Sequence, residues 1–182
     1  MKGTETMKIL AFGVLLFISS FWAQTDKAHS AGADPWKALS FLEGTWTANT
    51  QGGSAGASGS GSYTFQKELG NHILARHTVD SAGCKGPATY DCEHHDLLYI
   101  YQETGDQSLR AIYFDNEGHV IHYGVWTRGP GTVTFISEAS APGPRFRLVY
   151  ELQGTTMSGK FEICMPGKDE WKPYLEWSGT KK

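Results

Sequence analysis

The chain has 182 residues, of which 40% are apolar, 13% aromatic and only 19% charged. This size and apolar content suffice for one domain with a substantial core, and plentiful glycine with few charges is typical of a turn-rich all-β protein. The formal net charge is −3 and no basic run occurs. Because nucleic-acid binding needs clustered lysine and arginine, we expect no nucleic-acid partner.

Residues 1–23 have the pattern of a secretory signal peptide. Two lysines precede an uncharged apolar stretch from Ile9 to Trp22, and Ala23 supplies the small residue of a cleavage position. The stretch is shorter than the roughly 20 residues of a membrane-spanning helix, so an uncleaved anchor is the less favoured alternative. We predict an exported protein, periplasmic or secreted, with no membrane span in its mature form. A flexible leader would cover residues 24–33, and one domain residues 34–182.

The three cysteines allow one disulfide and one leftover thiol. An exported protein meets an oxidising compartment, where thiols pair. Cys84 and Cys92 bracket a polar segment with Gly-Pro turn chemistry, so we predict a bridge between them. Cys164 lies in a strand-like run and is predicted to be a buried free thiol.

The start of the predicted domain combines one helix with one flexible segment. Asp34 stands at a capping position, Pro35 follows it, and Trp36, Leu39 and Leu42 have helical spacing. Residues 49–61 are almost entirely glycine, serine, alanine and threonine, which predicts a flexible loop. No Gly-Lys-Ser/Thr motif ends this loop, so a phosphate-binding role is disfavoured.

Beyond residue 61 the apolar pattern alternates with period two, which is typical of strands separated by turns. The predicted strands cover residues 63–69, 72–80, 96–102, 108–114, 119–126, 132–138, 145–152, 155–165 and 171–179. With an opening strand at Trp46, about ten evenly spaced strands result, as in an up-and-down barrel or a sandwich. A closed barrel is favoured because closure removes exposed strand edges.

Hairpin turns predict which side chains share a face. If Gly70 and Asn71 are the central residues of a type II′ turn, Phe65 pairs with Arg76, and Tyr63 with Thr78. Arg76 then shares a face with both aromatic residues. His77 would lie on the opposite face.

The turn over residues 115–118 predicts the pairing of a second hairpin. It predicts that Ala111 pairs with His122, and Arg110 with Tyr123. Only one face of each hairpin can line an interior, and the sequence leaves that face open.

Several segments together resemble an uncharacterised bacterial lipocalin-like family. They are Phe41 to Trp46 with its Gly-x-Trp motif, Gly70 to Arg76, Ile112 to His119 and Trp171 to Gly179. The family is related in shape to nitrobindin-like haem barrels and fatty-acid-binding proteins. The resemblance implies an all-β, ten-stranded up-and-down antiparallel barrel of the calycin type, with a short N-terminal helix and a cavity. It also implies that Trp46 closes the base of the barrel.

The histidines and cysteines of the sequence favour neither a haem site nor a metal site. Nitrobindin-like barrels bind haem through a histidine near the C-terminal end of the barrel, but the last histidine here is His122. We therefore expect no haem and no other cofactor. Residues 92–96 hold the densest group of metal ligands, yet neighbouring residues of an extended segment point to opposite sides. We expect no metal site there.

Two functions of different classes follow from a cavity-bearing barrel. The leading one is non-catalytic binding of a small hydrophobic or amphipathic ligand, with an anion as one option because an Arg76 guanidinium inside the barrel would need a partner. The alternative is an isomerase- or cyclase-like enzyme with an interior His or Arg, since common hydrolase motifs are absent. The candidate ligand-binding residues are Trp46, Tyr63, Phe65, Arg76, His77, Arg110 and His122. The sequence leaves the oligomeric state open.

Overall fold

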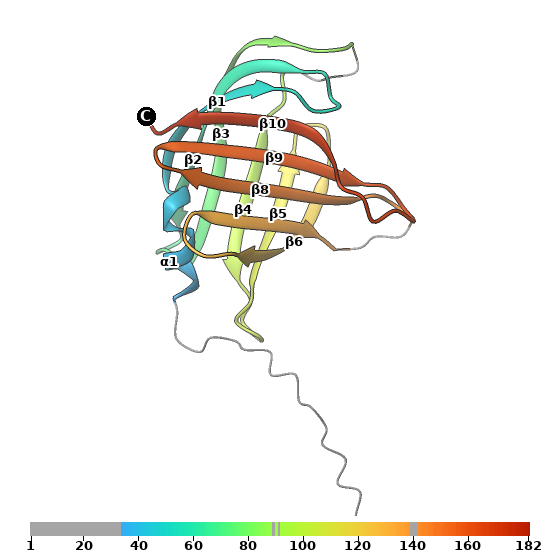
Figure 1. The fold of residues 1–182 in the computed structure, drawn as a ribbon. Coiled ribbons are helices and arrows are strands. Elements are labelled where there is room, and N and C mark those ends of the chain that lie inside the picture. Colours follow the sequence, from blue (N-terminus) through green and yellow to red (C-terminus); the bar gives the residue numbers. More distant parts are fainter. Residues whose placement is uncertain (1–33, 89, 91, 139–141) are drawn as a thin grey trace, which may run out of the picture. The chain divides into compact units, whose positions relative to one another are not determined.

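The computed structural model describes residues 34–88, 90, 92–138 and 142–182. The predicted signal peptide and leader lie outside the described residues. In the described part, ten antiparallel strands follow a short helix and close a barrel in consecutive order, with β10 returning to β1 (Figure 1). The strands are β1 (Gly44–Gln51), β2 (Ser58–Glu68), β3 (Ile73–Lys85), β4 (Asp96–Gln102), β5 (Leu109–Asp115), β6 (Val120–Thr127), β7 (Thr132–Ser137), β8 (Arg145–Gln153), β9 (Thr156–Cys164) and β10 (Lys172–Thr180). The predicted all-β barrel is confirmed.

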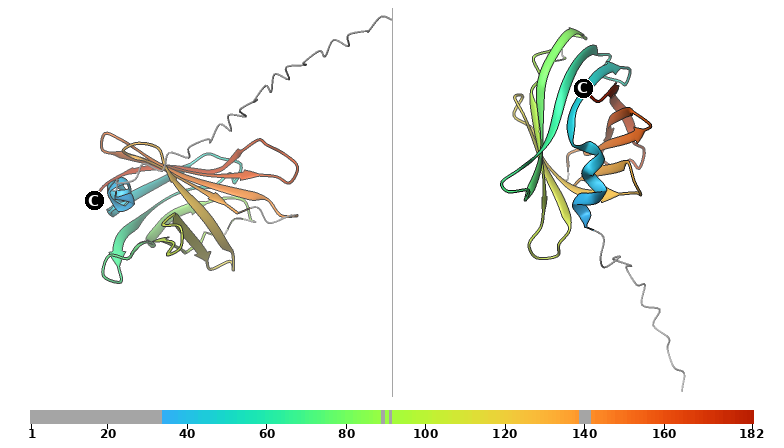
Figure 2. Two further views of the ribbon diagram at one scale, coloured as in Figure 1. Left: turned by 90° about the horizontal axis from the view of Figure 1, so that it is seen from below. Right: turned by 90° about the vertical axis from the view of Figure 1, so that its left-hand side faces the viewer.

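The helix covers one end of the barrel. The α1 helix (Pro35–Leu39) begins at the predicted cap, where the Asp34 side chain accepts a hydrogen bond from the Trp36 backbone at 3.0 Å, and continues as the 3-10 helix η1 (Ser40–Leu42). Leu39 and Leu42 are buried in the core. Figure 2 views this end in its right panel, with α1 in front of the strands. None of the described helices is long and apolar enough to cross a membrane.

We call the α1 end of the barrel the base and the opposite end the mouth. The base carries the turns at residues 69–72, 103–108, 128–131 and 154–155, and the mouth carries the other connections. The core that fills the base includes Trp46, Phe65, Leu74, Ile100, Val133, Phe135, Tyr150 and Met157. Trp46 is 2% exposed, and its indole nitrogen donates to the Leu42 carbonyl at 2.7 Å.

The β2–β3 hairpin has the predicted register. Phe65 pairs with Arg76, and Tyr63 with Thr78. The predicted turn type was wrong, because both Gly70 and Asn71 have positive φ angles (66° and 71°). Positive φ at both central residues is the feature of a type I′ turn, which gives the same two-residue loop and hence the same pairing.

The predicted register of β5 and β6 was wrong by one residue. Ala111 pairs with Tyr123, and His122 with Ile112. The loop holds three residues rather than two, because the Asp115 amide donates to the His119 carbonyl at 3.3 Å and Gly118 adopts a φ of 90°. A glycine with positive φ after a tight turn is the usual three-residue hairpin. The extra residue exchanges the faces of every side chain on β6.

The predicted flexible loop at residues 49–61 was also wrong. Most of this segment is sheet: Asn49 pairs with Ser60, and Thr50 with Gly59. Backbone hydrogen bonds in the ladder do not depend on side-chain size, so a run of small residues can pair like any other. Its small side chains have a different role, described next.

Candidate ligand-binding site

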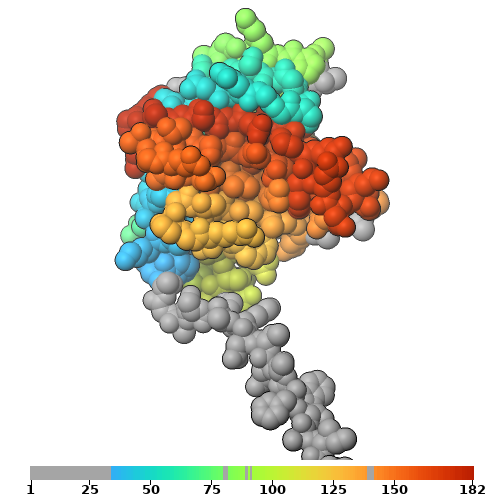
Figure 3. All heavy atoms as spheres, in the orientation of Figure 1, coloured from blue at the N-terminus to red at the C-terminus, as the bar shows by residue number. Residues whose placement is uncertain are grey.

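A cavity of about 420 Å³ occupies the mouth half of the barrel. Toward the mouth, the wall contributed by β1 and β2 carries small residues, including Ala48, Gly59, Ser60 and Gly61. Across the cavity lie the larger Phe146, Leu148, Phe161 and Ile163 of β8 and β9. In Figure 3 the side chains of β8 to β10 form a continuous surface on this side of the molecule. The cavity therefore exists where small residues leave space that the base fills with large ones.

Aromatic side chains form the cavity floor. Tyr63, Tyr150 and Trp177 all line it. The ring centroids of Tyr63 and Tyr150 are 6.0 Å apart, and those of Tyr150 and Trp177 are 5.8 Å apart. Tyr123 joins them from β6. We refer to these four residues as the aromatic floor.

An ion pair lies beside this floor. Arg76 Nη1 contacts Asp96 Oδ1, and the two side chains are only 12% and 11% exposed. The Thr78 hydroxyl donates to the same oxygen at 2.8 Å, and the guanidinium carbon lies 4.9 Å from the centre of the Tyr63 ring. Burial alone would raise the pKa of Asp96, but Arg76 outweighs burial and holds that pKa well below its usual range. The charged partner of Arg76 is thus part of the protein.

A second polar group stands closer to the mouth. His94 Nδ1 lies 2.9 Å from Glu117 Oε1, and His94 Nε2 lies 3.0 Å from the Tyr113 hydroxyl. Asp96 Oδ2 is 3.6 Å from the same Nε2. Burial lowers the pKa of His94, but the bonds to Asp96 and Glu117 and the nearby carboxylate charges raise it to about 9. His94 is therefore a cation at neutral pH.

Three side chains at the mouth could hold a metal ion. One ligand atom from each of His94, Asp115 and Glu117 lies within 4.8 Å of the other two. Nitrogen and carboxylate oxygen donors of this kind suit zinc. Asp115 also contacts His119 Nδ1 at 2.9 Å. In the structure the carboxylates are satisfied by histidine and backbone donors, so the group is complete as a hydrogen-bonded network.

Four buried polar atoms have no hydrogen-bond partner among the described residues. They are Tyr63 Oη, Arg76 Nε, Tyr150 Oη and Trp177 Nε1. All four residues line the cavity. Buried polar groups are nearly always paired, so unpaired ones that gather at a cavity indicate a place where a ligand supplies the partner.

The structure divides the predicted ligand-binding residues into three groups. Tyr63 and Arg76 line the cavity. Trp46 and Phe65 lie in the core of the base, and the Phe65 ring packs edge-on against Tyr150 at 5.4 Å. The remaining three residues are His77, Arg110 and His122, and the structure places none of them among the described residues that line the cavity.

Those three residues occupy the outer surface. His77 Nε2 lies 2.8 Å from Glu68 Oε1, and Arg110 Nη1 lies 3.6 Å from Glu138 Oε1. His122 is exposed. Sequence reasoning placed His122 with Ala111 because of the one-residue register error. It missed Asp96, Tyr113, Tyr150 and Trp177, for which inward alternation along each strand was the available signal, and His94, which precedes β4.

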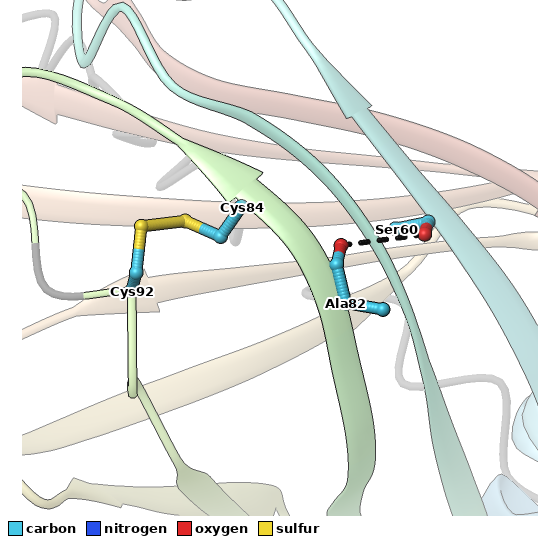
Figure 4. The surroundings of a disulfide bond; sticks show 4 residues. All are labelled: Ser60, Ala82, Cys84 and Cys92. Carbon is cyan, nitrogen blue, oxygen red and sulfur yellow. Dashed lines mark hydrogen bonds between the residues drawn. A yellow bond between two sulfur atoms is a disulfide. The ribbon is translucent and has the colours of Figure 1, made fainter.

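The predicted disulfide is confirmed. Cys84 on β3 and Cys92 are bridged, and Cys164 is buried and free. Figure 4 shows the bridge beside the hydrogen bond from the Ser60 hydroxyl to the Ala82 carbonyl, 3.4 Å long. Both cysteines line the cavity. The bridge therefore anchors the connection between β3 and β4 at the mouth.

The closed ten-stranded barrel is consistent with a calycin or lipocalin-like fold. Comparison with known protein families finds no family model that matches the chain, and comparison with curated proteins finds no significant match.

Proposed function

We propose that this protein binds a small amphipathic molecule in the barrel cavity. The observation that carries the proposal is the cavity itself, which has apolar walls and four unpaired polar atoms at its floor. Its volume of about 420 Å³ lies in the range of small-molecule sites, which combine apolar lining with a few placed polar groups. Metal binding is not needed for this function.

The proposal includes export and a place in a lipocalin-like family. The signal-peptide pattern of residues 1–23 supports export, and the disulfide is compatible with an oxidising compartment. The Gly-x-Trp motif at Gly44 and the barrel topology support the family. Intact mass of exported material tests the first point. A chain beginning near Gln24 is expected, and a chain that retains residues 1–22 contradicts cleavage.

The test of binding has two steps. Native mass spectrometry of protein purified from its own host is expected to show a retained small molecule. Binding of the neutral fluorescent probe 1-aminoanthracene is then compared in two variants of adjacent β6 residues. Ile121→Trp fills the cavity from its wall, whereas Val120→Trp adds the same bulk on the exposed outer face. Loss of probe binding only in the first is expected, and equal binding in both variants contradicts the proposal.

A second candidate function is acid–base catalysis on a bound molecule. It is favoured by one observation: two pairs of ionisable groups within hydrogen-bond reach, His94 with Tyr113 and Arg76 with Asp96, line the same cavity. Such pairs are typical of acid–base sites. The test follows the chemical fate of the retained molecule. Conversion by the wild type that His94→Gln abolishes, while binding persists, supports an enzyme.

A further inference from the structure

We infer that the cavity floor selects a neutral hydrogen-bond acceptor of the carbonyl type, in preference to a carboxylate. This inference rests on the proposed binding function and adds the chemical class of the ligand's head group. It departs from the anionic ligand that an unpaired Arg76 would favour. Three features of the floor lead to it.

The first feature is an excess of donors. Arg76 Nε and Trp177 Nε1 can only donate hydrogen bonds, and the two tyrosine hydroxyls can donate as well. By distance and angle none of the four atoms makes a hydrogen bond within the described chain, although the Trp177 side chain is close enough to the Tyr63 hydroxyl to lower its pKa against the larger effect of burial. Burial raises the pKa of both Tyr63 and Tyr150, so these hydroxyls keep their protons. A ligand oxygen with two lone pairs can satisfy two of these donors at once.

The second feature is that the four donors are neighbours. The Arg76 guanidinium carbon lies 4.9 Å from the Tyr63 ring centre. The Tyr150 ring lies 6.0 Å from that of Tyr63 and 5.8 Å from that of Trp177. An acceptor placed on the floor is therefore close to donors from β2, β3, β8 and β10. No single strand could supply this arrangement.

The third feature is the sign of the local charge. Asp96 already cancels the charge of Arg76 through Nη1. Burial is the main cause of the raised pKa of Tyr123, and the negative charges of Asp96 and Asp115 add to it. At Tyr150 the positive charge of Arg76, which lowers the pKa, has a larger effect than the negative charge of Asp96, which raises it. An added carboxylate would lose its hydration beside an Arg76 that Asp96 already neutralises, whereas a neutral oxygen would lose far less on burial.

The cavity walls fix the orientation of such a ligand. Phe146 and Phe161 stack at 5.7 Å, and Ile163 lies beside them in the cavity lining, on the mouth side of the floor. An apolar body would lie against these residues. The polar end of the ligand would thus enter first and rest at the floor.

The experiment uses three compounds of one shape in competition with 1-aminoanthracene. They are 5-phenylpentan-2-one, 4-phenylbutanoate and (4-methylpentyl)benzene, which end in a methyl ketone, a carboxylate and a branched alkyl group. We expect the ketone to bind at least about tenfold more tightly than either of the others at pH 7, because the hydrocarbon leaves donors unpaired and the anion loses its hydration beside an ion pair that is already complete. Equal affinity of all three, or tightest binding of the carboxylate, overturns the inference.

Variants locate the effect at the floor. Tyr150→Phe removes one donor and is expected to weaken the ketone about three- to tenfold with little change for the hydrocarbon. Tyr99→Phe is the matched control, since Tyr99 packs against His77 outside the cavity. Asp96→Asn leaves the Arg76 charge uncancelled and is expected to shift preference toward the carboxylate. An unchanged preference in Asp96→Asn contradicts the charge argument.

Failure of the proposed binding function can be distinguished from failure of the head-group inference. If 1-aminoanthracene and all three compounds leave the wild type unoccupied, the proposed binding function fails. If the probe binds and the compounds compete without regard to their end groups, binding stands and the head-group inference fails.

Discussion

The two ends of this barrel are built from the same strands but by opposite choices of side chain. At the base, Trp46, Phe65, Phe135 and Met157 are almost completely buried. At the mouth, the same strands β1 and β2 carry Ala48, Ser60 and Gly61 around a cavity. One end is therefore filled by large side chains, and the other is hollow. Each of the following predictions compares the two.

The largest effect is expected at the base. Trp46→Ala removes a buried indole and its hydrogen bond to Leu42, and should lower the free energy of unfolding by about 3–5 kcal/mol. Urea denaturation measures this loss. Ile163→Ala at the mouth is the comparison, because its side chain already borders empty space. Ile163→Ala should lower the free energy of unfolding by less than half as much as Trp46→Ala. Equal losses would mean that the mouth is as well packed as the base.

The disulfide is the main covalent constraint on the mouth. Replacing Cys84 and Cys92 together by serine should lower the free energy of unfolding by about 2–3 kcal/mol, because the closed loop is short. Reductant should have the same effect on the wild type. A Cys164→Ala variant should respond to reductant like the wild type. If it does not, the free thiol takes part in exchange with the bridge.

Two glycines allow the inner and outer faces of the barrel wall to be compared. A Cβ at Gly159 would lie 2.1 Å from the Trp177 ring inside the barrel, and a Cβ at Gly124 would lie 2.4 Å from the Trp126 ring outside. Trp126 is 50% exposed and can move, whereas Trp177 belongs to the aromatic floor. Gly159→Ala should lower the free energy of unfolding by about 1–3 kcal/mol and weaken the binding of 1-aminoanthracene. Gly124→Ala should lower the free energy of unfolding by less than Gly159→Ala does, and it should leave the binding of 1-aminoanthracene unchanged.

A pH dependence is also expected at the mouth. The pKa of His94 is raised to about 9 by Asp96 and Glu117, against the opposing effect of burial. A raised folded-state pKa stabilises fully below the unfolded pKa of about 6.5, and the contribution disappears as pH rises through about 9. The melting temperature should therefore decrease as the pH is raised from about 6.5 to about 9. His94→Gln should remove that part of the profile, and an identical profile in the variant contradicts the assignment.

Much of the fold could be predicted because local patterns determine it. Alternation with period two marked the strands, and the two-residue turn at Gly70 placed Arg76 on the same face as Tyr63 and Phe65. The register at Gly118 could not be predicted in the same way. Composition there permits a loop of two or three residues, and the choice depends on one positive φ angle.

The candidate site was less predictable because it depends on contacts between strands that no turn connects tightly. Arg76 and Asp96 pair across β3 and β4, which are joined by the cysteine-containing segment, and no hairpin rule fixes that register. The small residues at 49–61 also misled prediction. Low side-chain volume is typical of loops, but here the same composition forms a wall with a hollow behind it.

The seam between β1 and β10 has a consequence for how the chain folds. Nine strand pairs join neighbours in sequence, whereas the tenth joins the first strand to the last, at Asn49 with Ser178 and Thr50 with Trp177. The Lys182 amide also donates to the Thr45 carbonyl at 2.8 Å. Hairpins need only neighbouring residues, whereas this pairing joins the two ends of the barrel domain. We therefore expect it to form last, since distant pairings carry the largest loop-closure entropy. Until β10 docks, β1 and its partner edge expose unpaired backbone groups to other chains. A truncation before residue 172 should therefore yield an aggregating open sheet rather than a smaller barrel.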